Sequence, residues 1–277
     1  MAPTPPDPER PPQALPGEEP PPAGPLKAYE DLDFLRSADA RVIRVIAELL
    51  EPQFRFERHG IEDTIVFFGS ARIPEAVPAN DPNPDAGGLA ALTPYYDDAR
   101  ELARQLTQWS QDRPGERQFV VSSGGGPGIM EAANRGAVEA GGPTIGLGIS
   151  LPFEPAGNPY LTPDLAFEFH YFFVRKFHFL YTAKAVVYFP GGFGTLDELM
   201  ELLTLIQTQK VRKRMGVVLY GRSFWDSVID FDAMVAHGVI SPEDRELFVF
   251  ADDVDSAFTQ ICGFLEENYG ESLLEQD

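Results

Sequence analysis

Seven short apolar runs, rich in Val, Ile and Phe, recur along the chain from residue 64 onward. Each is followed by a turn that carries glycine and then by a segment with helical periodicity. The runs span residues 64–68, 118–121, 144–149, 165–169, 185–189, 215–219 and 247–250. Nearly continuous apolar strands that alternate with helices are typical of a parallel sheet covered on both faces. The pattern therefore predicts an α/β fold with a doubly wound, Rossmann-like sheet of about seven strands.

The chain before this repeat has a different character. Residues 1–25 hold 11 of the 26 prolines, and such a segment buries too little apolar surface to offset its ordering entropy. We expect a disordered tail over residues 1–26. The apolar spacing over residues 29–58 predicts an amphipathic helix or helix pair, within an N-terminal helical extension at 27–60. The sheet domain then spans 61–277.

Two further segments interrupt the repeat of strands and helices. Residues 81–88 contain two prolines and two glycines and predict an irregular surface insertion, whereas residues 94–109 predict a helix.

Composition narrows the class of protein. A chain of 277 residues can bury one sizeable core. Its formal net charge of -21 repels phosphate polymers and anionic membranes, so we expect neither a nucleic acid nor a membrane partner. Cys262 is the only cysteine, which excludes an intrachain disulfide and favours a reducing cytoplasm. The sequence has no run of ~20 apolar residues and no signal-peptide pattern at its start.

Two of the expected strand-to-helix turns are unusually rich in glycine. The first, Ser-Ser-Gly-Gly-Gly-Pro-Gly-Ile-Met-Glu, covers residues 122–131, and the second, Pro-Gly-Gly-Phe-Gly-Thr-Leu-Asp-Glu, covers residues 190–198. Glycine lets the backbone approach a ligand, and the N-H groups that open the next helix attract anions. Since ligands of doubly wound sheets bind at such turns, the pair indicates a nucleotide or sugar phosphate site.

The best-known phosphate motifs do not fit these turns. Neither turn matches G-x-G-x-x-G, and no Gly-Lys-Ser or Gly-Lys-Thr occurs in the chain. A dinucleotide site and a P-loop are therefore poorly supported, and the pattern favours a monophosphate ligand. The four histidines show no metal-ligand spacing, so we expect no metal site. No G-x-S-x-G elbow is present, so we do not expect a serine hydrolase.

Thr195 and Glu198 admit two interpretations. Thr-x-x-Glu at a helix start is a capping box, in which the two side chains only close the helix end. Alternatively, the carboxylate of Glu198 lies beside the sugar of a ligand whose phosphate occupies the glycine turn. The helix dipole would lower its pKa and keep it ionised.

Charged residues near the two turns extend the candidate site. Arg175 and Lys176 follow an aromatic stretch one strand earlier, and we interpret them as a cationic pair at the pocket mouth rather than as a solvated surface pair. Glu131 has a similar position after the first turn, with the alternative role of an acid that complements the helix dipole.

The second turn resembles the P-G-G-x-G-T-x-x-E signature of the lonely guy (LOG) family of phosphoribohydrolases, whose members are often mislabelled as lysine decarboxylases. Residues 123–128 with Met130 resemble the companion glycine loop of that family, and Arg175-Lys176 resembles its Arg-Lys pair. Phe68-Gly69-Ser70 is similar to its first strand turn. The resemblance covers about residue 64 to the last helix, and the N-terminal extension and the 81–88 insertion lie outside the family core.

The resemblance implies hydrolysis of the N-glycosidic bond of a nucleoside 5'-monophosphate, of the AMP or cytokinin riboside monophosphate type. The products would be a free base and ribose 5-phosphate, with no cofactor and with water as nucleophile. Glu198 would stabilise positive charge at C1', and Arg175 would act on the nucleotide and leaving base. The implied substrate-binding residues are Gly124, Gly125, Gly126, Gly191, Gly192, Gly194 and Thr195, with looser matches at Glu154, Lys176 and Thr204.

Two alternatives follow from the same resemblance. Pyridoxal phosphate chemistry needs a Schiff-base lysine in the site, and only Lys176 is placed near a candidate anion loop, so the decarboxylase label has no chemical support. A non-catalytic nucleotide or phosphorylated-cofactor carrier of the same fold remains the second hypothesis. The family resemblance also implies a homodimer or a larger homo-oligomer.

Overall fold

The computed structural model describes residues 25–77, 86–113, 118–150 and 157–270. The chain divides into two compact units, Met1–Ile46 and Ala47–Asp277, and helix α2 (Arg41–Arg58) crosses the division. In the first unit, the short helix α1 (Leu32–Arg36) begins after Asp31, whose carboxylate accepts a hydrogen bond from the Phe34 N-H at 3.0 Å. The Arg44 guanidinium donates to the carbonyls of Leu35 and Ser37 beyond it. The expected helix pair is thus present.

The second unit contains a seven-stranded, wholly parallel sheet with the order β4-β3-β2-β1-β5-β6-β7. All seven predicted strands are confirmed, with ends that differ by a few residues. Their bounds are β1 Asp63–Phe68, β2 Phe119–Ser123, β3 Thr144–Ile149, β4 Ala166–Phe169, β5 Ala183–Tyr188, β6 Gly216–Tyr220 and β7 Val249–Ala251.

The strand order creates a topological switch point between β1 and β5. From β1 the chain adds β2, β3 and β4 outward on one side, then returns to place β5 against the other side of β1. The helices that follow neighbouring strands therefore lie on opposite faces at this point, which leaves a crevice beyond the carboxyl ends of the strands. The ligand site is expected there.

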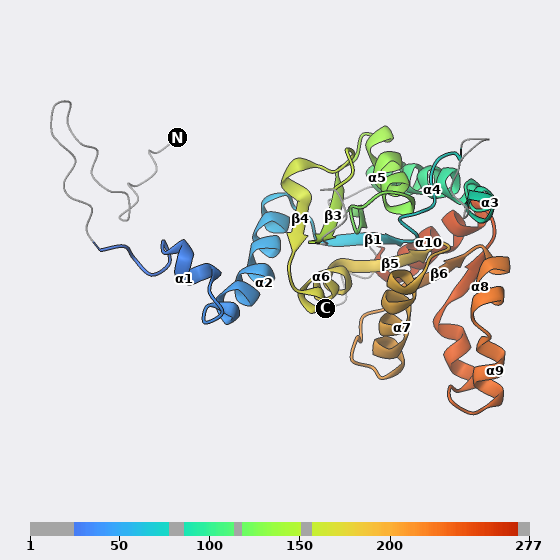
Figure 1. Cartoon of the computed structure of the whole chain (residues 1–277). Helices are drawn as coiled ribbons and strands as arrows, with labels where there is room; N and C mark the ends of the chain where they lie inside the picture. The colour runs from blue at the N-terminus through green and yellow to red at the C-terminus, as the bar shows by residue number, and fades with distance from the viewer. Residues whose placement is uncertain (1–24, 78–85, 114–117, 151–156, 271–277) are drawn as a thin grey trace. The chain divides into compact units, whose positions relative to one another are not determined.

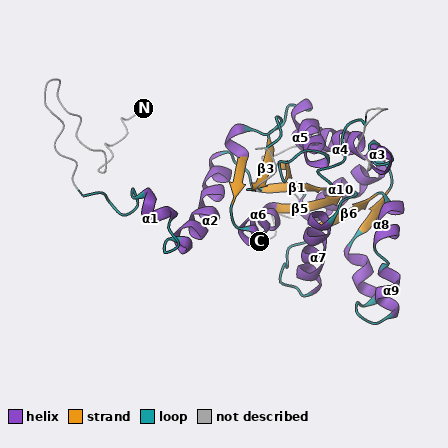
Figure 2. Cartoon of the chain, viewed as in Figure 1, coloured by secondary structure: helices purple, strands orange, loops and turns teal. Residues whose placement is uncertain are grey.

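Helices cover both faces of the sheet, as Figure 2 shows. Their bounds are α3 Ala86–Ala90, α4 Pro94–Gln111, α5 Ile129–Glu139, α6 Phe172–Thr182, α7 Phe193–Gln207, α8 Arg222–Val228, α9 Phe231–Ala236 and α10 Val254–Tyr269, with 3-10 turns at Pro163–Leu165 and Pro242–Leu247. The predicted helix at 94–109 is confirmed. The expectation of irregular structure at 81–88 is wrong at its end, where α3 begins at Ala86, and residues 81–85 lie outside the described residues.

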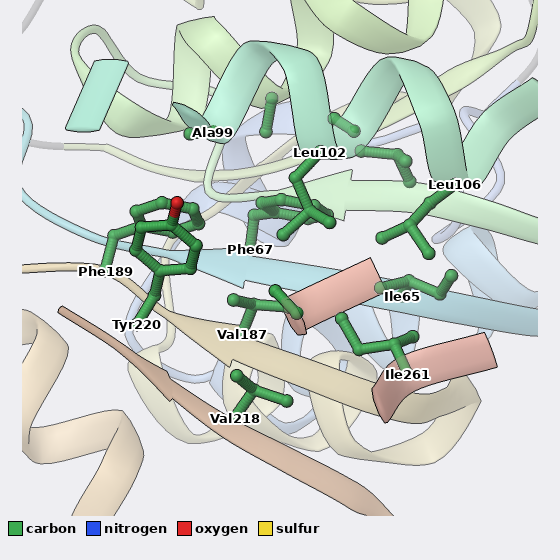
Figure 3. Packing of buried hydrophobic residues seen from close by; sticks show 14 of the residues in the cluster. Ile65, Phe67, Ala99, Leu102, Leu106, Val187, Phe189, Val218, Tyr220 and Ile261 are labelled. Atoms are coloured by element: carbon green, nitrogen blue, oxygen red, sulfur yellow. The ribbon is translucent and has the colours of Figure 1, made fainter. Parts of the chain in front are cut away.

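One face of the sheet packs against α4, α5 and α10. Ile65 and Phe67 of β1 contact a layer that includes Leu102 and Leu106 of α4 and Ile261 of α10, as the close view in Figure 3 shows. All of these side chains are at most 1% exposed. Burial of such branched and aromatic side chains stabilises the fold by ~1.5–3 kcal/mol each.

The opposite face carries α6 and α7, which lie below the sheet in Figure 1. Phe179 of α6 meets Phe68 of β1 edge-on with ring centroids 4.8 Å apart. The buried Tyr188 hydroxyl at the end of β5 donates to the Glu198 carbonyl at 3.1 Å. This bond holds α7 against β5 and fixes the position of Glu198 relative to the end of that strand.

The second half of α2 lies along the edge strand β4. The Arg55 guanidinium lies 3.9 Å from the centroid of the Phe167 ring and donates to the Ala166 carbonyl. The Glu48 carboxylate accepts the backbone N-H groups of His170 and Tyr171, where α6 begins. This half of α2 therefore covers a sheet edge that would otherwise expose unpaired backbone groups. Within the described residues, no helix is both long and apolar enough to cross a membrane.

Candidate functional site

A pocket of about 1230 Å³ opens at the carboxyl ends of the central strands. Its walls include the turn at residues 69–72 after β1, the glycine loop at 124–126 after β2 and residues 148–150 at the end of β3. Residues 166–168 of β4, Arg175 of α6 and residues 191–198, which form the turn after β5 and the start of α7, also line it. The pocket thus lies at the switch point, and the structure brings both predicted glycine turns into one site.

The second glycine turn forms the N-terminus of α7, which begins at Phe193 with Gly192 as its N-cap. Thr195 is therefore the third helical residue and Glu198 lies in the second turn, so the capping-box interpretation of this pair is wrong. A side chain at Gly191 would place its Cβ 2.1 Å from the Thr195 Oγ1 atom, so the turn closes only with glycine there. The first N-H groups of a helix have no intrahelical partner and can bind an anion.

Glu198 is a buried acid on the pocket wall, 9% exposed. Burial raises the pKa of its carboxyl group from 4.5 to about 7, although the nearby positive charges of Arg175 and Lys176 act in the opposite direction. The expectation that the helix dipole keeps this group ionised is therefore wrong, because desolvation outweighs it. A carboxyl group with this pKa exchanges a proton readily at neutral pH.

Arg175 reaches the pocket from the first turn of α6. Its Nε donates to the Leu147 carbonyl at 2.6 Å, and its guanidinium lies 5.1 Å from the centroid of the Phe179 ring. A Cβ at Gly124 would lie 2.6 Å from the Arg175 Nη2 atom. The first glycine loop thus leaves room for this cation, which the structure brings into the same pocket as Glu198.

The first glycine loop is held by a buried amide network that the sequence interpretation missed. Asn158 Nδ2 donates to the carbonyls of Gly125 and Gly126 at 3.1 Å and to Asn134 Oδ1 at 2.9 Å. The Ser123 hydroxyl also donates to Asn134 Oδ1, at 2.7 Å, and accepts the Gly125 N-H. That N-H is therefore already bonded, so the two glycine turns are not equivalent as anion sites. In the sequence, Asn134 is a polar residue within the otherwise apolar face of α5, and this could have indicated a buried polar network.

Three predicted or considered residues lie away from the described pocket wall. Lys176 Nζ bridges Asp197 and Glu201 of α7 at 2.8 and 2.7 Å, and the exposed Thr204 donates to the Met200 carbonyl within α7. Glu131 accepts a hydrogen bond from the buried Tyr96 hydroxyl at 3.0 Å. Glu154 lies outside the described residues.

Arg72 is a pocket residue that the sequence interpretation did not consider. It lies in the turn after β1, where its N-H donates to the Ser70 hydroxyl at 3.1 Å. Its position two residues beyond Gly69-Ser70, the turn of the central strand, was the signal that could have found it. Over the described ranges, the side chains form no group of three or more His, Cys, Asp or Glu that could hold a metal ion.

Fold and site define a doubly wound α/β protein with a pocket at its switch point, where a glycine-rich helix N-terminus meets a buried glutamate. Comparison with known proteins agrees with this class. Residues 130–261 match the family model described as "Possible lysine decarboxylase". The chain is 29% identical over 160 residues to the rice protein "Cytokinin riboside 5'-monophosphate phosphoribohydrolase LOG", covering 57% of this chain and 62% of the rice protein.

A second rice relative, "Probable cytokinin riboside 5'-monophosphate phosphoribohydrolase LOGL9", is 31% identical over 165 residues, which cover 58% of this chain and 68% of that protein. The chain therefore belongs to the LOG family. Among solved structures, the molybdenum cofactor carrier protein of Chlamydomonas reinhardtii superposes with a TM-score of 0.49 at 20% identity, over 74% of this chain and 98% of that protein.

Proposed function

We propose that the protein hydrolyses the N-glycosidic bond of a nucleoside 5'-monophosphate to a free base and ribose 5-phosphate. The observation that carries this proposal is the position of Glu198, a buried acid in the second turn of a helix that begins at a glycine-rich turn. Family membership supports the reaction class, since the rice relatives are named as phosphoribohydrolases of cytokinin riboside 5'-monophosphates.

In this proposal the phosphate lies on the backbone N-H groups at the start of α7, contributed by Gly191, Gly192, Gly194 and Thr195. The dipole of the 15-residue helix α7 supports a negative charge at this end. With the phosphate there, the ribose extends along the pocket wall toward Glu198, one turn farther into the helix. A ligand without a phosphate lacks this anchor and leaves C1' unplaced.

Glu198 and Arg175 act at the reacting bond. As the C1'–N bond lengthens, positive charge develops on the ribose ring, and the Glu198 carboxylate stabilises it in a site that burial has partly desolvated. Water then bonds to C1', and Glu198 accepts the proton that the water loses and passes it to the departing base, which restores the carboxylate. Arg175, held by the Leu147 carbonyl, faces the leaving base and stabilises the electron pair that departs with it.

The lysines do not fit a pyridoxal phosphate site. No lysine belongs to the described pocket wall. Lys176 is engaged by two carboxylates of α7, Lys184 pairs with Asp63 at 2.8 Å, and Lys213 donates to carbonyl groups at the end of α6. A Schiff-base lysine needs to reach the cofactor ring, so the residues present favour hydrolysis over the decarboxylation that the family model's description suggests.

Product analysis tests the proposal. Purified protein is incubated with AMP, CMP, GMP and isopentenyladenosine monophosphate, and free base and ribose 5-phosphate are quantified by chromatography. We expect stoichiometric release of the two products from at least one nucleotide and none above background with Glu198→Ala. Saturable binding of a nucleotide without base release would overturn the proposal and favour the carrier hypothesis.

We further propose that the chain forms a homodimer or larger homo-oligomer through the outer face of α6. Phe173, Phe177 and Tyr181 recur at every fourth residue of α6 and are 61%, 40% and 59% exposed. Contiguous exposed aromatic groups of this kind are typical of interaction sites. Phe172 and the 93% exposed Phe193 border the pocket, so a partner on this face would lie beside the substrate. Light scattering of the protein and of Phe177→Asp checks this, since the variant should be monomeric.

A further inference from the structure

The described pocket wall contains more negatively charged than positively charged side chains. It contains three carboxylates, from Glu168, Asp197 and Glu198, but two cations, Arg72 and Arg175. The whole chain carries a formal net charge of -21. A phosphate that carries nearly two negative charges at neutral pH is therefore repelled by most of its surroundings, and the two arginines decide where it can bind.

Arg175 lies against the carboxyl ends of β2 and β3. Its Nε is bonded to the Leu147 carbonyl at the end of β3, and its Nη2 lies against Gly124 after β2. This position suits the sugar and base. Lys176 pairs with Asp197 and Glu201 of α7, so its charge is already engaged by two carboxylates.

Arg72 lies in the turn after β1, which contacts both glycine turns: the Ser70 carbonyl accepts the Ile129 N-H at 3.2 Å on the side of the first turn. The turn after β1 is joined to the glycine turn after β5 because the Ser70 N-H donates to the Pro190 carbonyl at 3.0 Å. The Arg72 N-H in turn donates to the Ser70 hydroxyl, which fixes the backbone of Arg72 at this junction. Its side chain is exposed on the pocket wall, and no carboxylate in the described part of the chain forms an ion pair with it.

We propose that Arg72 is a specificity-determining residue that pairs with the 5'-phosphate of the substrate and selects phosphomonoester dianions over nucleosides. This inference rests on the proposed function. A guanidinium matches phosphate oxygens with two parallel N-H donors, and it complements backbone N-H groups that carry no net charge. The two arginines then have separate tasks: Arg72 anchors the phosphate, and Arg175 acts at the base.

Binding and turnover of Arg72→Ala test this assignment. Ribose 5-phosphate binding is measured by calorimetry in the inactive Glu198→Gln background, and AMP hydrolysis in the otherwise unaltered protein. We expect the Kd for ribose 5-phosphate and the KM for AMP to rise at least tenfold, which corresponds to about 1.4 kcal/mol, with kcat within about threefold. Arg72→Lys should restore part of the affinity. Arg212→Ala, which removes an exposed arginine outside the pocket, is the matched control.

The pH dependence of binding adds a readout that a merely structural role would not change. The phosphate loses its second proton near pH 6, so the affinity of the Arg72 protein for ribose 5-phosphate should increase through that range, and Arg72→Ala should flatten the increase. Unaltered ribose 5-phosphate binding by Arg72→Ala would overturn the assignment even if AMP is cleaved. Arg72-dependent binding of AMP without cleavage would overturn the proposed function and leave the assignment intact.

Discussion

Replacing Glu198 by Gln should make the protein more stable at alkaline pH while it abolishes hydrolysis. Gln keeps the size of the side chain and its capacity for hydrogen bonds, but it carries no charge to desolvate. The substitution therefore isolates the energetic consequence of burying an ionisable group at this position, where the side chain is 9% exposed.

The magnitude follows from the displaced pKa. Burial raises the pKa of the Glu198 carboxyl group from 4.5 to about 7. At ~1.4 kcal/mol per pKa unit, this rise corresponds to about 3 kcal/mol of folding free energy. The folded protein keeps the proton over the interval in which the unfolded chain has already lost it. The folded state of the wild type is thus progressively destabilised as the pH rises from 4.5 to about 7.

The free energy of unfolding, measured by urea denaturation at several pH values, checks this reasoning. Relative to wild type, Glu198→Gln should gain up to about 3 kcal/mol between pH ~4 and pH ~8. Glu267→Gln, on the exposed surface of α10, reports the effect of removing one carboxylate from this acidic chain. An equal difference between Glu198→Gln and wild type across the whole range would refute the assignment of a buried, proton-binding acid.

Three further substitutions test the geometry of the site and the fold. Gly191→Ala should lower kcat/KM for AMP at least tenfold, because its Cβ would lie 2.1 Å from the Thr195 hydroxyl oxygen. Gly263→Ala in α10, outside the described pocket wall and with nothing within 4 Å of its Cβ, serves as control in the same assay. Asn158→Ala should cost about 1–3 kcal/mol of unfolding free energy in urea titrations and reduce turnover, because it leaves buried carbonyls of the glycine loop unpaired; full stability would argue against the network. Leu102→Ala should cost about 2–5 kcal/mol without changing KM, since it creates a cavity in the core away from the pocket.

The fold was predictable because its signal is local. Each strand is a nearly unbroken apolar run such as residues 64–68, and buried parallel strands need no partner information to be found. The helix at 94–109 was predictable for the same reason. The helical end of the predicted insertion could not be predicted. The Gly87-Gly88 pair indicates a loop in the local sequence, yet it lies within the short helix α3.

The site was only partly predictable because its chemistry depends on distant neighbours. The glycine turns and Glu198 stand out in sequence, but the direction of the Glu198 pKa change depends on how deeply α7 buries that residue. Lys176 follows Arg175 directly, yet consecutive residues of a helix point in different directions, so one lines the pocket and the other pairs with carboxylates of α7. The position of Arg72 just after Gly69-Ser70 marks it as part of a strand-to-helix turn, but only the contact between the turns after β1 and β5 brings that turn to the second glycine turn.

The central claim is that a phosphate bound at the start of α7 brings the glycosidic bond to Glu198. The most direct measurement compares AMP with adenosine as substrates at equal concentration, by the rate of adenine release. We expect rapid release of adenine from AMP. Release from adenosine should be at least a hundredfold slower, because adenosine lacks the phosphate that positions the glycosidic bond. Glu198→Gln should release adenine from neither compound. Equal rates from AMP and adenosine, or undiminished release by Glu198→Gln, would contradict this claim.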